Sequence, residues 1–127
     1  YENLRDIPLN KLITGNLIMR EEGSATRMVA EKHLDSMNIP VNPTLELGNN
    51  EAIKTAIQAG LGISILSAYS VEPEIAAGSV KIIDNNDWDC SRHINVYYRG
   101  DNLQTPAASI LIQALKNYSE MSQRNGF

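Results

Sequence analysis

The stretch ELGNNEAIKTAIQAGLGISILS, residues 46–67, contains the pattern that decides the fold. It completes a predicted strand over 44–47 and continues with a predicted helix over 51–59. Gly60 is in position to end that helix in the left-handed conformation. Residues 62–66 alternate apolar with small side chains, which is typical of a strand buried in a parallel sheet. The stretch therefore predicts a strand–helix–strand unit with parallel strands.

A similar strand and helix precede this unit. Residues 16–21 have the apolar run of a first strand. From Ser24 to about Asn38, apolar residues recur by threes and fours, as on one face of a helix. Pro40 and Pro43 then stop that helix. The order strand, helix, strand, helix, strand favours parallel pairing with right-handed crossovers.

Downstream of this unit the predicted elements are shorter. They are helical turns over 67–77, strands over 79–83 and 93–98, and a helix that begins at Thr105-Pro106. A threonine cap followed by a proline in the first turn is a common helix start. The predicted fold class is α/β, with a parallel-rich sheet flanked by helices.

Composition and charge restrict the function. The chain has 127 residues, 43% of them hydrophobic, so one domain is able to bury a substantial core. Its net charge is −4 and its Lys and Arg residues are spread out, whereas nucleic-acid binding needs a basic patch. No apolar run approaches the roughly 20 residues of a membrane span, and no signal peptide is recognisable. Cys90 is the single cysteine, which fits a reducing cytoplasm.

Two turns follow predicted parallel strands at their carboxyl ends, where open α/β sheets bind ligands. They are EEGSAT at 21–26 and GNN at 48–50. Each presents small polar residues and backbone N–H groups at a helix N-terminus, which suit a carboxylate, sulfate or phosphate. Ser24 and Asn50 are also explained as helix caps alone, each worth about 1 kcal/mol.

The charged residues near the first turn argue against a highly charged anion. Glu21 and Glu22 would repel it unless both point outward. As neighbours at a strand end they point in opposite directions, so they do not form an acid–base pair. Arg27 is expected on the solvated surface of its helix, as are Glu72 and Glu74 on a later one.

No constellation for catalysis or metal binding is recognisable in the sequence. Asp84, Asp87 and Asp89 fail the calcium-loop template, which requires Gly at its sixth place and Glu at its twelfth. The Gly-x-Ser-x-Gly nucleophile elbow is absent. His33 falls on the apolar face of its helix, where a core or boundary role is expected, and no motif surrounds Cys90. Neither a metal nor a cofactor is expected.

Four stretches resemble one known family. They are IPLNKL (7–12), LIMREEGSATR (17–27), the stretch 46–67 quoted above, and INVYYRGDNLQTPAASILIQALKNY (94–118). In this order they resemble the effector-binding region of LysR-type transcriptional regulators over almost the whole chain. Within that family the sequence looks most like members that regulate carbon fixation or sulfur and nitrogen assimilation.

The resemblance implies a type 2 periplasmic-binding-protein-like fold, in which two α/β subdomains are joined by crossing strands. Residues 1–7 would be a hinge segment and residues 8–95 would be subdomain two. Residues 96–127 would be the return strand and the closing helix of subdomain one. The rest of subdomain one, and the N-terminal winged helix-turn-helix that binds DNA, would lie outside this chain.

The resemblance also implies a site. Subdomain two would supply one wall of the cleft that binds a small, anionic effector, with contacts from Glu22, Gly23, Ser24, Thr26, Gly48, Asn49 and Asn50. The intact protein would be a cytoplasmic homo-oligomer that contacts DNA only through its N-terminal domain and does not contact a membrane.

The last helix is expected to carry an apolar stripe whose partner in subdomain one is missing. The stripe consists of Ile110, Leu111, Ala114 and Leu115. Because exposed apolar patches mark interfaces, we expect a second copy of the chain, or the sheet itself, to cover it. Two other classes of protein share this fold. One is half of an extracytoplasmic solute-binding protein. The other is an enzyme such as a dehydratase, but the sequence offers no acid–base pair for it.

Overall fold

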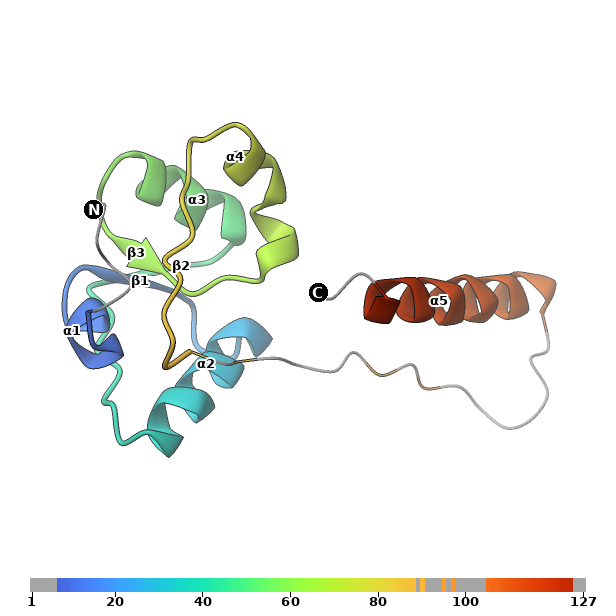
Figure 1. Ribbon diagram of the computed structural model, residues 1–127, viewed down its shortest axis with the longest axis horizontal. Helices are drawn as coiled ribbons and strands as arrows, with labels where there is room; N and C mark the ends of the chain where they lie inside the picture. Colours follow the sequence, from blue (N-terminus) through green and yellow to red (C-terminus); the bar gives the residue numbers. More distant parts are fainter. Residues whose placement is uncertain (1–6, 89, 91–94, 96, 98–104, 125–127) are drawn as a thin grey trace. The chain divides into compact units, whose positions relative to one another are not determined.

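The computed structural model describes residues 7–88, 90, 95, 97 and 105–124 (Figure 1). The chain divides into two compact units, residues 1–92 and residues 93–127. In the first unit the described residues form a sheet with helices around it. In the second they form one long helix, α5 (Pro106–Arg124).

Three parallel strands form the sheet, in the order β2-β1-β3. They are β1 (Leu17–Arg20), β2 (Leu45–Leu47) and β3 (Ile63–Ser64). Ile18 lies opposite Leu45 on one side and opposite Ser64 on the other. β1 is therefore hydrogen bonded along both edges, and the predicted α/β class with a parallel sheet is confirmed.

Helices cover both faces of this sheet (Figure 1). In chain order they are α1 (Leu9–Ile13), α2 (Ala25–Ser36), α3 (Asn50–Gln58), the 3₁₀ turn η1 (Ala68–Ser70) and α4 (Glu72–Ala76). Leu17 and Met19 belong to a core cluster with α1 and α2, whereas Ile18 packs with Ile53 and Ala56 of α3. The division follows from the alternation of side chains along a strand. Leu17, Ile18 and Met19 are each at most 1% exposed, so β1 is the centre of the core.

The predicted elements up to residue 77 are confirmed with shifted or narrower bounds. The strand predicted over 62–66 is reduced to Ile63–Ser64, and the helical turns over 67–77 are η1 and α4. Gly60 ends α3 with φ 76°, the left-handed conformation that the sequence predicted.

The strand predicted over 79–83 is wrong. The backbone N–H groups of Ser79 and Val80 both donate to the carbonyl oxygen of Glu74, at 3.0 and 3.3 Å. These donors close the C-terminal turn of α4 and are not available for a sheet ladder. The other predicted strand, over 93–98, lies outside the described residues except for Asn95 and Tyr97.

The last helix begins as predicted. Pro106 is its first residue, and the hydroxyl oxygen of Thr105 accepts a hydrogen bond from the backbone N–H of Ala108 at 3.3 Å. In the second unit taken by itself, the residues of the predicted apolar stripe, Ile110, Leu111, Ala114 and Leu115, are exposed.

Lys54 ties α3 to α4. Its Nζ lies 2.7 Å from a carboxylate oxygen of Glu74 and 2.7 Å from one of Glu51. The side chain of Glu74 is only 17% exposed, so its predicted place on a solvated surface is wrong, whereas Glu72 is exposed as predicted. The hydrogen bond from Lys54 lowers the pKa of Glu74 below its ordinary value.

This depressed pKa predicts an acid-dependent contribution to stability. The contribution is complete above the ordinary pKa of Glu, about 4.3, and is lost as the pH falls through the lower pKa of the folded state. Above about pH 5, the urea concentration at the unfolding midpoint should therefore be higher for the wild type than for Lys54→Met. The difference between the two midpoints should shrink below about pH 4. Lys81→Met, at an exposed lysine, is the control and should follow the wild-type profile. A difference that stays constant from pH 6 to pH 3 would contradict the assignment.

Gly62 allows the close approach of two chain segments. A Cβ at this position would lie 2.0 Å from the carbonyl oxygen of Asn16, which accepts a hydrogen bond from the backbone N–H of Ile63 at 2.9 Å. The clash is with backbone, so a side chain at position 62 would force β3 away from the start of β1.

Gly62→Ala should therefore lower the free energy of unfolding by about 1–3 kcal/mol, the range for overpacking a close contact. Urea unfolding followed by circular dichroism measures the change. Gly48→Ala is the matched control, because a Cβ at Gly48 would meet no atom within 4 Å. Equal midpoints for the two variants would show that the close approach is not a constraint.

Candidate ligand-binding site

The carboxyl ends of β1 and β2 lead into the two turns that the sequence singled out. The backbone N–H of Glu21 donates to the carbonyl of Leu47 at 3.2 Å, so the turns start side by side. The first continues through Gly23, which has φ 85°, into α2, and the second continues through Gly48 into α3. Two helix N-termini with their free N–H groups therefore follow neighbouring strands at one edge of the sheet.

Arg20, the last residue of β1, links the two turns. Its Nε and Nη2 donate to the two carboxylate oxygens of Glu21 at 2.7 and 2.8 Å, and its Nη1 donates to Oδ1 of Asn50 at 2.8 Å. The hydrogen bonds from Arg20 lower the pKa of Glu21. The charge of this glutamate is thus neutralised within the turn, while Glu22 is exposed. Arg20 was not among the predicted site residues, although an arginine that ends an apolar strand and precedes a glutamate is a visible signal in the sequence.

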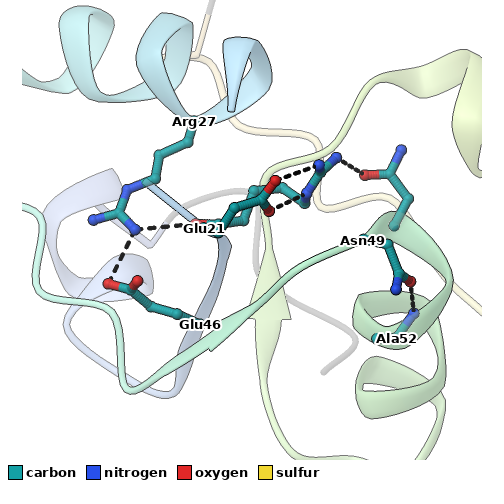
Figure 2. A network of polar contacts seen from close by, with 7 residues as sticks. Glu21, Arg27, Glu46, Asn49 and Ala52 are labelled. Carbon is teal, nitrogen blue, oxygen red and sulfur yellow. Dashed lines mark hydrogen bonds and ion pairs between the residues drawn. The ribbon is translucent and has the colours of Figure 1, made fainter. Parts of the chain in front are cut away.

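Arg27 holds the end of β1 from the other side (Figure 2). It is only 8% exposed, so the prediction that it lies on the solvated surface is wrong. Its Nη1 donates to the carbonyl oxygen of Arg20 at 3.0 Å and lies 3.0 Å from a carboxylate oxygen of Glu46, and its Nε lies 2.6 Å from one of Glu31. Since Arg20 ends the strand, its carbonyl needs a donor from outside the ladder, and Arg27 supplies it.

One of the two predicted helix caps lies at a different residue, and the other makes no capping hydrogen bond. Asn49 rather than Asn50 caps α3, because its Oδ1 accepts from the backbone N–H of Ala52 at 2.8 Å (Figure 2). Asn50 is the first helical residue, and its side-chain oxygen is bonded to Arg20 instead. Ser24 occupies the N-cap position of α2 as predicted, but its side chain makes no capping hydrogen bond. Capping therefore does not account for the hydroxyl group of Ser24.

The remaining predicted site residues lie on the same two turns or just beyond them. Gly23 and Gly48 are exposed, and Thr26 is half-buried in the first turn of α2. Two shallow hollows, of about 320 and 460 Å³, are lined by residues near the C-terminal end of α2, such as Ile39 and Pro40. Neither hollow includes a residue of the two turns.

Among the described residues no three His, Cys, Asp or Glu side chains gather as metal ligands would. None of the described helices combines the length and the apolar character that a membrane crossing requires.

The fold and the two polar turns define an α/β domain of the kind that binds a small molecule at the carboxyl edge of its sheet. The chain belongs to the LysR substrate binding domain family, whose profile matches residues 2–120. This confirms the family resemblance of the four sequence stretches.

Known relatives agree with this assignment. The chain is 36% identical to the HTH-type transcriptional activator CmpR of Synechocystis over 90% of its own length and 36% of that protein. It is 32% identical to a RuBisCO operon transcriptional regulator of Acidithiobacillus ferrooxidans, over 88% of the chain and 34% of that protein. The chain thus spans about a third of the length of these regulators, neither of which is named as an enzyme.

A solved structure has the same fold. The regulatory domain of CcmR from Synechocystis PCC6803, in complex with 2-PG, superposes with a TM-score of 0.67 and is 29% identical. The superposition covers 86% of this chain and 52% of that one. This likeness confirms the type 2 periplasmic-binding-protein-like fold.

Arg27→Met should destabilise the first unit by about 1–3 kcal/mol, because the carbonyl of Arg20 loses its donor and two carboxylates lose their partner. Urea unfolding measures the loss. Lys32→Met, at an exposed position of the same helix, should stay within about 0.5 kcal/mol of the wild type. Equal stability of both variants would refute the structural role of Arg27.

Proposed function

We propose that this chain is part of the effector-sensing domain of a LysR-type transcriptional regulator, and that its two polar turns form one wall of the effector cleft. The observation that carries the proposal is the likeness to the CcmR regulatory domain, which was solved in complex with 2-PG. The regulators among the relatives support the same role. We propose a small anionic effector and use 2-PG as its probe.

The polar groups of the wall suit an anion. The N-termini of α2 and α3 both carry partial positive charge, and the left-handed Gly23 lets a ligand approach the backbone closely. Ser24 is only 8% exposed, and its hydroxyl makes no hydrogen bond with the described residues, so its donor is left for a ligand that reaches the turn. The proposed wall comprises Glu22, Gly23, Ser24, Thr26, Gly48, Asn49 and Asn50. The side-chain oxygen of Asn49 caps α3, so its side-chain NH2 and its backbone N–H are the groups left to contact a ligand.

The division of the chain into subdomains is part of this proposal. Residues 1–7 are the hinge segment, residues 8–95 are subdomain two, and residues 96–127 are the return strand and closing helix of subdomain one. The exposed stripe of α5 would then be covered in the intact regulator by the remainder of subdomain one, or by a second copy of the chain.

The proposed regulation is a population shift. The effector changes DNA binding only if it binds the closed cleft better than the open one. A coupling of about 1–3 kcal/mol is typical of such linkage. The intact protein is proposed to be a cytoplasmic homo-oligomer that binds DNA through a separate N-terminal domain and performs no catalysis.

Ser24→Ala should weaken the binding of 2-PG by about tenfold, because a hydrogen bond to a charged group is worth about 1.5–3 kcal/mol. The melting temperature should change little, since Ser24 makes no capping hydrogen bond. Titration of ¹⁵N-labelled chain with 2-PG, followed by NMR, measures an affinity that a single wall keeps weak.

Ser36→Ala is the matched control at the other end of α2, where the hydroxyl bonds to the carbonyl of His33 at 2.6 Å. Its affinity for 2-PG should equal that of the wild type. If Ser24→Ala lowers the melting temperature while leaving the affinity unchanged, Ser24 serves the helix and not the ligand.

A further inference from the structure

The side-chain amide of Asn50 has a fixed polarity. Nη1 of Arg20 lies 2.8 Å from its Oδ1. A guanidinium has only donors, so the amide must present its oxygen to Arg20. Its nitrogen, with two N–H donors, is then turned away from Arg20 and makes no hydrogen bond with the described residues. Asn50 is also the first residue of α3, so these donors lie at a helix N-terminus.

Arg20 itself is held in place by two further contacts. Its guanidinium forms a bidentate pair with Glu21, and its carbonyl oxygen accepts from Arg27 at 3.0 Å. Arg20 is also half-buried at the end of the central strand, which limits the rotamers open to it. Planar bidentate pairs of this kind fix geometry as well as charge.

We propose that Arg20 is a positioning residue that orients Asn50, and that the Asn50 amide nitrogen is the group that selects an anionic effector at this wall. The inference rests on the proposed function and adds to it a specific donor and the residue that aims it. Because Glu21 neutralises the guanidinium, Arg20 does not bind the anion directly. The wall therefore recognises the effector through neutral N–H donors, namely the Asn50 amide and the backbone of the two helix N-termini.

This assignment explains how a glutamate, Glu21, is compatible with an anion site beside it. Glu21 would repel an anion if its charge were free, but both of its carboxylate oxygens are bonded to Arg20. The pair is neutral as a whole, and its effect is to fix the direction of an amide from the neighbouring turn. Glu22 has no such partner among the described residues and is exposed.

Asn50→Asp separates the two roles of the side chain. An aspartate still accepts the hydrogen bond from Arg20, and a negative charge in the first turn of a helix is favourable, so the melting temperature should be equal or higher. The variant presents a carboxylate oxygen where the wild type presents N–H donors. Its affinity for 2-PG should fall at least tenfold, measured by NMR titration of the 127-residue chain.

A matched variant controls for the added charge. Thr55→Glu places one negative charge on the exposed surface of the same helix, one turn further on. Its affinity for 2-PG should stay within about twofold of the wild type, because a solvent-exposed charge interacts only weakly through water of high dielectric constant. An equal loss for Thr55→Glu and Asn50→Asp would assign the effect to net charge and overturn the role of the amide.

The positioning role of Arg20 is tested by a double-mutant cycle. Arg20→Gln should weaken 2-PG binding several-fold in the wild-type background, since the Asn50 amide is then free to rotate. In the Asn50→Ala background the same substitution should weaken binding less, and only by the repulsion from the freed charge of Glu21. A purely structural role for Arg20 would weaken both backgrounds equally, and that result would overturn the positioning role.

The outcomes also distinguish this inference from the function on which it rests. If 2-PG shifts no backbone resonance of the wild-type chain, the proposed function fails, and the inference fails with it. If 2-PG shifts the resonances of residues 22–26 while Asn50→Asp keeps wild-type affinity, the proposed function stands and the inference alone is wrong.

Discussion

The position of Leu17–Arg20 between two parallel strands is the constraint on which the rest of the structure depends. Both edges of this strand are hydrogen bonded and both of its faces are buried, so its end is a fixed point. The side chain of Arg20 extends from that point to Asn50 in the neighbouring turn, and Arg27 donates a hydrogen bond to the carbonyl oxygen of Arg20. The direction of polar groups at the candidate site is therefore set by the core, not by the flexibility of the turns.

Local features of the fold and the parallel pairing of its strands were predictable from the sequence, whereas long-range side-chain partners were not. Gly60 and the Thr105-Pro106 start act within one helical turn, and both are confirmed. Arg27 of α2 was predicted wrongly because its partner Glu46 comes from strand β2, and helical periodicity carries no information about such a partner. Glu74 was predicted wrongly for the same reason, since Lys54 belongs to a different helix.

At the candidate site, too, the sequence predicted the local elements but not the partner of each side chain. The sequence identified both turns, because small polar residues at helix starts are a local signal. It did not distinguish Asn49 from Asn50, since a cap is defined by backbone dihedral angles and the two residues are adjacent. Once the geometry is known, one asparagine serves the helix and the other is held by Arg20. The family relationship and the likeness to the CcmR regulatory domain support the proposal that this edge binds a ligand.

The central claim is that the two turns form one wall of an effector cleft. The most direct test is a crystal structure, with 2-PG, of the intact regulator that we propose contains this chain. We predict that the ligand lies within hydrogen-bond distance of the Ser24 hydroxyl and the Asn50 amide nitrogen, with the Arg20–Glu21 pair intact. A ligand bound elsewhere in the domain, with no contact to residues 22–26 or 48–50, would contradict the account.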